Sequence, residues 1–443
     1  MIWLIYNSVL PALLILSFPY YFLRMWKRGQ ISYCWKERFG FYNSNVKEKL
    51  ADLNSPIWFH AVSVGEVKVA SVLIEEIRKR NPKQSIVLST TTITGRRLAE
   101  SLERKGVVVI FHSVDLWVCV NQSLKTVNPS MLILIEQELW PNLLYACNLE
   151  DVPVWVVNAR LSDRSYRRFK KMQLWTRPLL SLLDFVGVPS LQDIKRFRES
   201  GFPAHKLFVT GSLKYDVVPE LNEEVELKNQ RLLDRLGWSD KDQILVFGST
   251  HPEEEEFLLN QIKNLDEGEQ RIKVILVPRH AERWRELQNL CQRRSLTFKL
   301  RSDLGERSQD PDVLIVDTTG ELAYLYGIAD INVIGKSFLG IGGQNFLEAA
   351  RFGKPIIVGP EMSNFRDLVD QFKREGALIQ LAENRHFKEK IQTLLDNPNK
   401  AQVLGERAQA LFSENRGAAG KQAKMILDCL DSVDTPEVLG ASG

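Results

Sequence analysis

The chain has 443 residues, 44% of them hydrophobic, so it is long enough for about two to three average domains with sizeable cores and is not of the disordered class. Its formal charge of +3, from 58 Lys and Arg against 55 Asp and Glu, is too small to indicate nucleic-acid binding by itself. The five cysteines form no Cys-x-x-Cys pair and the six histidines no His-Glu-x-x-His motif. We therefore expect a globular protein of a reducing compartment, with no disulfide framework, no protein-held metal and no nucleic-acid partner.

The N-terminal segment, residues 1–28, has the pattern of an uncleaved membrane anchor. Its first 23 residues carry no charged side chain, and Arg24, Lys27 and Arg28 follow at once. A secretory signal has the opposite order, and positive charge on this side places the rest of the chain on the cytoplasmic side of the membrane. A stretch of about 20 apolar residues can span the hydrocarbon core. Asn7 and two prolines leave open a helix that lies in the membrane interface instead.

Short β-branched runs alternate with helical patterns from about residue 56 onward. Between the first two runs, Ala70, Leu73, Ile74 and Ile77 follow the spacing of one helix face. This alternation predicts parallel βαβ units. The expected strands of this first domain are Ile57–Phe59, Ile86–Thr90, Val107–Phe111, Met131–Ile135, Val154–Val157 and Phe185–Val188.

A polar, highly charged segment, residues 217–242, lacks strand patterning and is predicted to link two domains through a helix. Beyond it the alternation resumes, which predicts a second α/β domain over residues 243–402 after the first over 29–216. Helices over 403–430 and a tail over 431–443 complete the chain. Ligands of open parallel sheets bind at the carboxyl ends of the strands, so we expect a cleft facing those ends. The expected strands of the second domain are Ile244–Phe247, Lys273–Val277, Val313–Val316, Ile331–Ile334 and Ile356–Val358.

The segment Gly335–Ala350, GKSFLGIGGQNFLEAA, combines a strand end, glycines and the predicted start of a helix. Glycines let a backbone approach a ligand closely, and free N–H groups at a helix start favour a phosphate. The dinucleotide fingerprint fails, because Asn345 stands where its third glycine should be. A plain tight turn is the alternative. Glu348 bonds a ribose hydroxyl pair or caps the helix on which it lies.

Two further strand ends carry polar residues that can reach the same place. Ser249, Thr250 and His251 follow one predicted strand, and Arg279 and His280 follow the next. Arginine suits a phosphate because its donors form a planar fork. Each residue alone would more often be an ordinary loop residue, but three polar strand ends in one domain predict a nucleotide-phosphate site.

In the first domain, Glu136 and Glu138 follow a predicted strand, where they either face a ligand or begin a helix. The stretch NARLSDRSYRRFKK then gathers basic residues, among them Arg160, Arg164 and Arg167, around a single acidic one. A solvated helix face would usually mix both signs of charge. The stretch therefore favours a phosphorylated or membrane-surface partner.

Taken in chain order, nine segments resemble the motifs of the 3-deoxy-D-manno-octulosonic acid (Kdo) transferases. The resemblance covers roughly residues 20–420 and includes the anchor. It implies a GT-B fold with two Rossmann-like domains, and metal-independent, inverting transfer of Kdo from CMP-Kdo to the lipid A precursor (lipid IVA) in lipopolysaccharide biosynthesis. The location it implies is the cytoplasmic face of a Gram-negative inner membrane. The segments are HAVSVGE, TTTITG, EQELWPN, NARLSDRS, GSLKYD, GSTHPEE, VPRHAER, TTGELAYLYGIAD and GGQNFLEAA.

The resemblance places the catalytic base on Glu66, in SVGE, and no cofactor beyond the donor is implied. The acceptor is expected at Glu136, Glu138, Arg160, Arg164 and Arg167. The CMP donor is expected at Ser249, Thr250, His251, Pro278, Arg279, His280, Thr319, Gly320, Glu321, Gly342, Gly343, Asn345, Phe346, Leu347 and Glu348.

Two positions depart from the family pattern. Lys336 replaces a glycine of the usual Gly-Gly-Ser, and it either adds positive charge near the donor's carboxylate or phosphate or blocks close approach. Gln344 replaces the histidine of Gly-Gly-His-Asn and can form hydrogen bonds without carrying charge. Both concern the geometry of donor binding.

Glu66 has two interpretations on the sequence alone. Ser63 and Glu66 have the Ser-x-x-Glu spacing of a capping box, in which Glu66 folds back on the Ser63 N–H. A catalytic base instead needs its carboxylate open to the cleft. The resemblance favours the base.

Two rival functions are compatible with parts of the sequence. A nucleotide-diphosphate-sugar 2-epimerase of similar architecture would explain the nucleotide site but not the anchor or the basic stretch. A membrane-tethered nucleotide-sugar sensor would need the donor site without a base, and Glu66 in its motif argues against it.

Overall fold

The computed structural model describes residues 2–27, 35–103, 105–221, 223–239, 241–263, 265, 271–305 and 310–434. Arg28, Cys34 and the tail after Asp434 lie outside these described residues, as do residues 222 and 240 of the expected linker. The chain divides into two compact units. Unit 1 comprises Met1–Val217 and Arg416–Gly443, and unit 2 comprises Val218–Asn415.

Unit 1 is built on a seven-stranded sheet of the order β3-β2-β1-β4-β5-β6-β7 within the described residues. All its strand pairs are parallel, and Ile57 of β1 is in register with Ile86 of β2 and Met131 of β4. The strands are β1 (Ile57–His60), β2 (Ile86–Thr90), β3 (Val108–Phe111), β4 (Met131–Ile135), β5 (Val154–Val157), β6 (Phe185–Val188) and β7 (Leu207–Val209).

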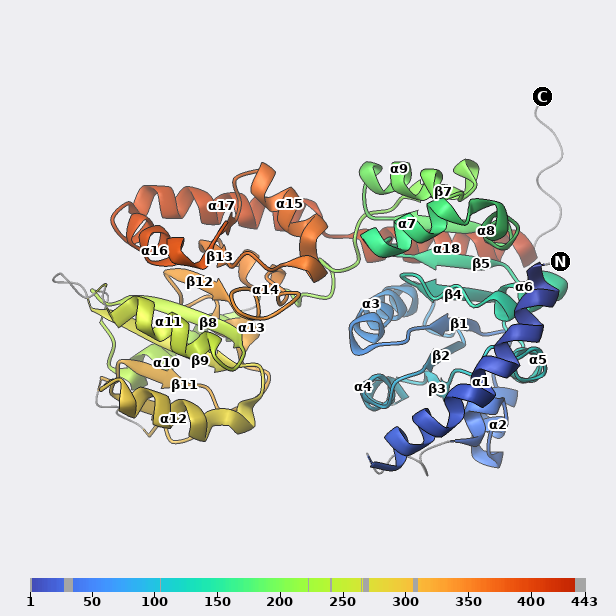
Figure 1. Cartoon of the computed structure of the whole chain (residues 1–443), viewed down its shortest axis with the longest axis horizontal. Coiled ribbons are helices and arrows are strands. Elements are labelled where there is room, and N and C mark those ends of the chain that lie inside the picture. The colour runs from blue at the N-terminus through green and yellow to red at the C-terminus, as the bar shows by residue number, and fades with distance from the viewer. Residues whose placement is uncertain are drawn as a thin grey trace. The chain divides into compact units, whose positions relative to one another are not determined.

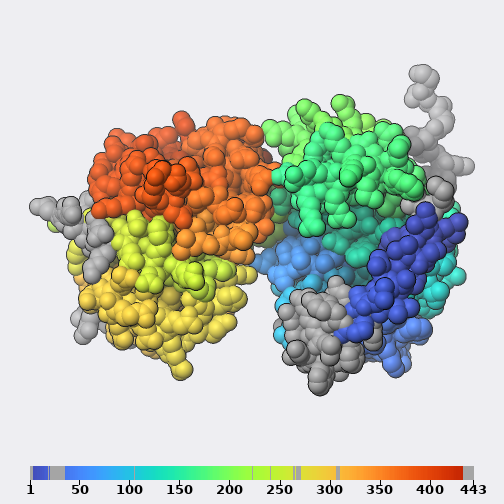
Figure 2. All heavy atoms as spheres, in the orientation of Figure 1, coloured from blue at the N-terminus to red at the C-terminus, as the bar shows by residue number. Residues whose placement is uncertain are grey.

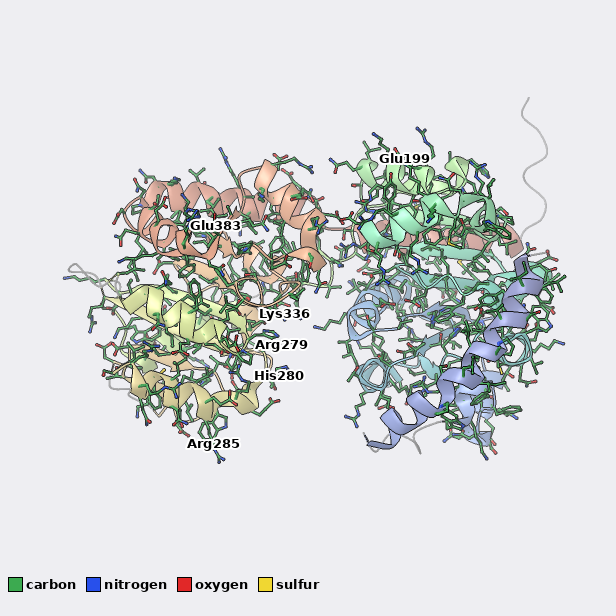
Figure 3. All side chains as sticks on the ribbon, in the orientation of Figure 1. Glu199, Arg279, His280, Arg285, Lys336 and Glu383 are labelled. Atoms are coloured by element: carbon green, nitrogen blue, oxygen red, sulfur yellow. The ribbon has the colours of Figure 1, made fainter. Side chains whose placement is uncertain are left out.

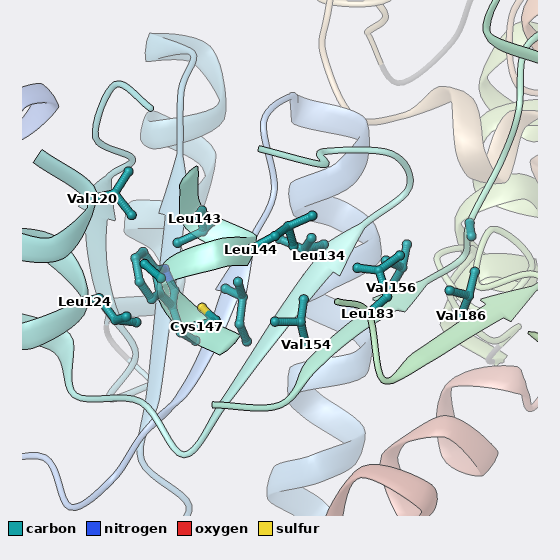
Figure 4. Close-up of a cluster of buried hydrophobic side chains, with 14 of the residues drawn as sticks. Val120, Leu124, Leu134, Leu143, Leu144, Cys147, Val154, Val156, Leu183 and Val186 are labelled. Carbon is teal, nitrogen blue, oxygen red and sulfur yellow. The ribbon is translucent and has the colours of Figure 1, made fainter. Parts of the chain in front are cut away.

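Helices cover both faces of this sheet (Figure 1). Successive strand residues point to opposite faces, so Trp58 belongs to one core cluster and Phe59 to the other. Figure 4 shows the first cluster, in which Leu134, Val154 and Val156 of the sheet pack near Leu143 and its neighbours on α6. The helices are α1 (Ile2–Lys27), α2 (Ser44–Ala51), α3 (Val64–Arg80), α4 (Ile93–Glu103), α5 (Trp117–Val127), α6 (Pro141–Leu149), α7 (Asp163–Lys171), α8 (Gln173–Leu180), α9 (Leu191–Glu199) and α18 (Ala418–Asp434).

Unit 2 repeats the plan, with a parallel seven-stranded sheet of the order β10-β11-β9-β8-β12-β13-β14 in the described residues. Its strands are β8 (Gln243–Thr250), β9 (Ile272–Pro278), β10 (Phe298–Leu300), β11 (Val313–Ile315), β12 (Ile331–Ile334), β13 (Ile356–Val358) and β14 (Ile379–Gln380). Its helices are α10 (Glu223–Leu236), α11 (Glu254–Lys263), α12 (Trp284–Arg293), α13 (Leu322–Leu325), α14 (Leu347–Ala350), α15 (Arg366–Arg374), α16 (Phe387–Leu395) and α17 (Pro398–Glu414).

Each strand expected from the sequence is present; six have the predicted ends, and the other five differ by one to three residues at an end. The segment 217–242 contains α10, which belongs to unit 2. The two C-terminal helices separate: α17 lies in unit 2, whereas α18 returns to unit 1 and packs on α3. The described cysteines, Cys119, Cys147, Cys291 and Cys429, are free.

The N-terminal segment forms the helix α1, which lies along the surface of unit 1 (Figure 2). Tyr6 donates a hydrogen bond to Asp115 (2.8 Å), and Asn7 and Asn142 exchange reciprocal amide bonds of 2.8 and 2.9 Å. Leu13 and Leu16, at 56% and 78% exposure, project from α1 into solvent. Among the described helices, none combines the length and the apolar character that crossing a bilayer requires.

Candidate functional site

The carboxylate site of unit 1 lies where the strand order reverses, between β1 and β4. Ligands of open parallel sheets bind outside the carboxyl ends of the strands at such a switch point. Ser63, just after β1, caps α3 through its hydroxyl, which accepts from the Glu66 N–H at 3.4 Å. The local sequence therefore starts a helix beside the switch point and sets Glu66 in its first turn.

Glu66 is folded back over the start of α3. One carboxylate oxygen accepts from the Val62 N–H (2.8 Å) and the other from the Ser63 hydroxyl (2.7 Å). The residue is only 8% exposed, and burial raises the pKa of its carboxyl. The hydrogen bonds lower this pKa, but by less than burial raises it, and the charge of Glu136 adds to the rise. Ser63 and Glu66 thus cap the start of α3 together, with the Val62 N–H as a donor to the carboxylate where the capping box has the Ser63 N–H. Each carboxylate oxygen keeps a second lone pair, so capping and proton acceptance are chemically compatible.

Glu136 and Glu138 follow β4 and lie close enough to Glu66 to interact electrostatically. The pKa of Glu138 is raised to about 7, mainly by burial and to a smaller extent by repulsion from Glu66. Glu136 has a left-handed backbone with φ of 63°, and its carboxylate lies 3.8 Å from the Lys214 ammonium. Strained conformations of non-glycine residues cluster at functional sites. The structure therefore brings the three predicted carboxylates together.

The predicted basic residues lie after β5, the strand next to β4, and on the helix that follows it. Arg160 follows β5, while Arg164 and Arg167 are exposed on α7, a helix with no buried residue. A hollow of about 310 Å³ lies beside α7 and α9, and none of these three arginines lines it. Its lining consists of Asp163, Tyr166, Lys195, Arg196 and Glu199.

The switch point of unit 2 lies between β8 and β12, and several predicted donor residues gather there. Ser249 adopts a left-handed φ of 57° at the end of β8, and the buried Thr250 hydroxyl donates to Glu255 (3.1 Å). His251 is partly buried, and its Nδ1 lies 3.2 Å from the Ser249 carbonyl oxygen. Gly335, at the end of β12, allows the two strand ends to approach, because an added Cβ would lie 2.6 Å from Ser249 O.

The end of the neighbouring strand β9 adds a cation, Arg279, and a second histidine, His280. Pro278 pairs with Thr250, and the Arg279 N–H donates to the Thr250 carbonyl (2.9 Å). The Arg279 and His280 side chains are exposed, and the rings of His280 and His251 lie 6.3 Å apart. These contacts place Pro278, Arg279 and His280 beside the Ser249–His251 turn.

Thr319, Gly320 and Glu321 follow β11, the other neighbour of β9. Thr319 and Gly320 are exposed. Burial opposes ionisation of Glu321, but bonds from Thr318, Tyr324 and Arg301 outweigh it and lower the pKa of its carboxyl. Since protein groups already satisfy the carboxylate, Glu321 has a structural role in this arrangement whatever else it binds.

The glycine loop ends in a helix of one turn, α14, shorter than the sequence suggests. Gly342 and Gly343 adopt φ of 104° and 71°, and Asn345 accepts from the Leu347 N–H (3.2 Å). Phe346 and Leu347 are fully buried. Only their backbone atoms are therefore suited to contact a ligand, whereas Glu348 is partly exposed.

Two features of the strand ends were not anticipated from the sequence. Glu254 is buried, and its carboxylate accepts from the N–H groups of Lys336 (2.6 Å), Ser337 (3.1 Å) and Phe338 (3.0 Å). It thereby fixes the loop after β12. In unit 1, His60 and His112 are buried with ring centroids 4.0 Å apart. The acidic residues just after Pro252 were a sequence signal for the Glu254 contact, but no sequence pattern links His60 to His112.

In the described part of the chain, His, Cys, Asp and Glu form no group of three or more that could hold a metal ion. Polar strand ends at the switch points of the two parallel sheets are typical of ligand-binding, Rossmann-like domains. A family model described as 3-deoxy-D-manno-octulosonic-acid transferase matches residues 33–217, and one described as glycosyl transferases group 1 matches residues 309–411.

The 3-deoxy-D-manno-octulosonic acid transferase of Haemophilus influenzae is 31% identical over 398 residues, which cover 89% of this chain and 91% of that protein. That of Bordetella pertussis is 31% identical over 428 residues, covering 93% and 96%. This chain belongs to the Kdo transferase family and is a glycosyltransferase of lipopolysaccharide biosynthesis.

A solved UDP-GlcNAc 2-epimerase from Neisseria meningitidis, bound to UDP-GlcNAc, matches with a TM-score of 0.57 and 14% identity. The match covers 85% of this chain and 100% of that one. At this identity the likeness concerns the fold alone.

Proposed function

We propose that the chain transfers Kdo from CMP-Kdo to a sugar hydroxyl of the lipid A precursor, lipid IVA, by an inverting, metal-independent mechanism with Glu66 as general base. The observation that carries the proposal is the group of three carboxylates at the unit 1 switch point. Glu66 and Glu138 both have raised pKa values there, which brings proton affinity closer to what base catalysis near neutral pH requires.

In this mechanism the acceptor hydroxyl attacks the anomeric carbon of Kdo while the bond to the CMP phosphate breaks. Glu66 takes the hydroxyl proton, and the electron pair of the broken bond remains on the phosphate oxygen. Arg279 and the N–H groups of the glycine loop stabilise that charge. Glu136 and Glu138 orient the acceptor sugar, and Arg160, Arg164 and Arg167 bind its phosphates. A single phosphate needs less charge compensation than a diphosphate, which fits a reaction without a metal.

The decisive experiment is the Glu66→Gln variant, assayed with CMP-Kdo and lipid IVA for CMP release and for the mass gain on the lipid. We expect transfer to fall by a factor of about 10² to 10⁴ while CMP binding, measured by calorimetry, stays within about twofold. Glu75→Gln, an exposed glutamate of the same helix, is the matched control. Near-normal transfer by Glu66→Gln would refute the role of Glu66. A 2-epimerase would convert its nucleotide sugar without the lipid, so the same assay separates the two activities.

We also propose that the enzyme lies on the cytoplasmic face of the inner membrane, with α1 in the interface. One face of α1 is hydrogen-bonded to unit 1 through Tyr6 and Asn7, while Leu13 and Leu16 are exposed. An exposed apolar helix face combined with basic residues is typical of interfacial binding. We expect Leu13→Glu/Leu16→Glu to abolish flotation with anionic vesicles. Leu149→Glu, on an exposed leucine at the end of α6, is the control and is expected to float.

A further inference from the structure

Lys336 is the second residue after β12 and lies at the switch point between β12 and β8. The ends of β8 and β12 are neighbours, since Ile334 is in register with Gly248. The side chain at this position therefore has access to the region outside the carboxyl ends of the strands, where ligands of such sheets bind.

The backbone of Lys336 is held in place from both sides. Its N–H donates to the buried Glu254 carboxylate (2.6 Å), and its carbonyl accepts from the Gly343 N–H (3.1 Å). Its φ is 58°, a left-handed conformation that favours glycine. A lysine in this conformation persists only because surrounding contacts fix it, which is a feature of functional sites.

The side chain of Lys336 extends over Gly340. An added Cβ on Gly340 would lie 2.8 Å from Lys336 Cγ, so the glycine leaves room for the lysine stem. Burial lowers the pKa of His251 most, and electrostatic interactions with Lys336, His280 and Arg279 lower it further, so these side chains lie near His251. Figure 3 shows Lys336, Arg279 and His280 along one edge of unit 2.

The carboxylates near this cluster are already engaged. Glu254 accepts from backbone N–H groups, and Glu282 lies 3.6 Å from His280. Within the described residues, no ion pair involves Lys336 or Arg279. Two neighbouring cations that are not engaged in ion pairs of their own favour the binding of an anion.

We propose that Lys336 binds an oxyanion of the donor, either the phosphate of CMP or the carboxylate of Kdo, and so raises donor affinity. The inference rests on the proposed function, because it takes CMP-Kdo as the donor. An ammonium group binds either oxyanion as a compact charge with three donors. The glycine of the family pattern offers no such charge, so Lys336 adds a donor contact that a glycine at this position cannot make.

The test compares the wild-type protein with Lys336→Gly by calorimetry with CMP and with cytidine, and by transfer kinetics with CMP-Kdo. Lys336→Gly relieves the left-handed backbone, so it is expected to unfold at the same or a higher temperature than wild type. If the phosphate is the ligand, CMP affinity falls by about tenfold and cytidine affinity does not change. If the carboxylate is the ligand, CMP affinity is unchanged and KM for CMP-Kdo rises by about tenfold. Unchanged CMP affinity together with unchanged KM overturns the inference.

Two further variants sharpen the result. Arg285→Gln removes an exposed cation elsewhere in unit 2, labelled in Figure 3, and is expected to leave donor affinity unchanged. Gly340→Ala displaces the lysine stem, so we expect it to weaken donor binding more in wild type than in the Lys336→Gly background. Equal effects in both backgrounds contradict the inference.

If wild type itself neither binds CMP nor transfers Kdo, the proposed function fails. If wild type does both and Lys336→Gly is indistinguishable from it, only the role of Lys336 fails.

Discussion

Ionisation of the Glu138 carboxyl lowers the stability of the folded protein. Its pKa is about 7 in the folded protein, raised by burial and by Glu66, against about 4.5 when unfolded. Between these values the folded state binds more protons than the unfolded state, so stability falls as pH rises from 4.5 through 7. We predict that Glu138→Gln, which cannot ionise, gains about 1.5 kcal/mol relative to wild type between pH 5 and pH 8, after allowance for partial exposure.

The measurement is the free energy of unfolding in urea at each pH. Glu150→Gln, on an exposed glutamate just after α6, controls for the loss of one negative charge from unit 1. A pH-independent difference between Glu138→Gln and wild type would show that Glu138 ionises normally.

His60 has the opposite pH dependence. Burial lowers its pKa to about 3 from 6.5, so it stays neutral in the folded state over a range where the unfolded state takes up a proton. Stability from this residue is therefore lost as pH falls below 6.5. We predict that wild type loses about 1.5 kcal/mol relative to His60→Gln between pH 6.5 and pH 5. Chemical denaturation of both proteins, with the exposed His205→Gln as reference, tests this; parallel pH curves would contradict it.

The sequence predicted some of these residue-level features and not others. The Ser-x-x-Glu spacing predicted that Ser63 and Glu66 would interact, since both lie within one helical turn. It could not predict that Glu66 approaches Glu138, because that depends on β1 and β4 being adjacent although β2 and β3 intervene in the chain. Sheet order, a long-range property, decides which strand ends share a site.

At the scale of elements, the strands missed from the sequence are β7, β10 and β14, and each lies at a sheet edge. They have two or three residues, and their side chains are largely exposed or half-buried. Strand recognition rested on apolar, β-branched runs, which arise where both faces of a strand are buried. The central strands meet that condition and these edge strands do not.

The docking of helix α1 on unit 1 can be tested directly. Asn7 and Asn142 exchange two amide hydrogen bonds, and Asn142 is fully buried. Asn7→Ala leaves the Asn142 amide without this partner, which costs about 1–2 kcal/mol. We predict faster hydrogen exchange across α1 in this variant. Ser8→Ala, one residue further along α1 and exposed, is the control, and an Asn7→Ala variant that exchanges like wild type would contradict the docking.

At the scale of the whole molecule, unit 1 depends on a chain segment that follows unit 2. Asp216 accepts from the N–H groups of Gly417 (2.7 Å) and Ala419 (2.8 Å), at the start of α18. Ala423 and Ile426 of α18 are buried in a unit 1 core cluster. The core of unit 1 is therefore complete only when α18 has returned, whereas the core of unit 2 lies within a continuous segment.

This division predicts two unfolding transitions with different sensitivities. Asp216→Ala removes the cap of α18 and is expected to destabilise unit 1 alone, by about 1–2 kcal/mol. CMP, if it binds unit 2 as proposed, is expected to stabilise only the other transition, by about 2.7 kcal/mol at a concentration 100 times its Kd. Calorimetric scans of both proteins, with and without CMP, resolve the two effects, and inorganic phosphate at equal concentration controls for ionic strength. A single transition that responds to both changes would mean that the units unfold together. If CMP instead stabilises the transition that Asp216→Ala lowers, the nucleotide binds unit 1.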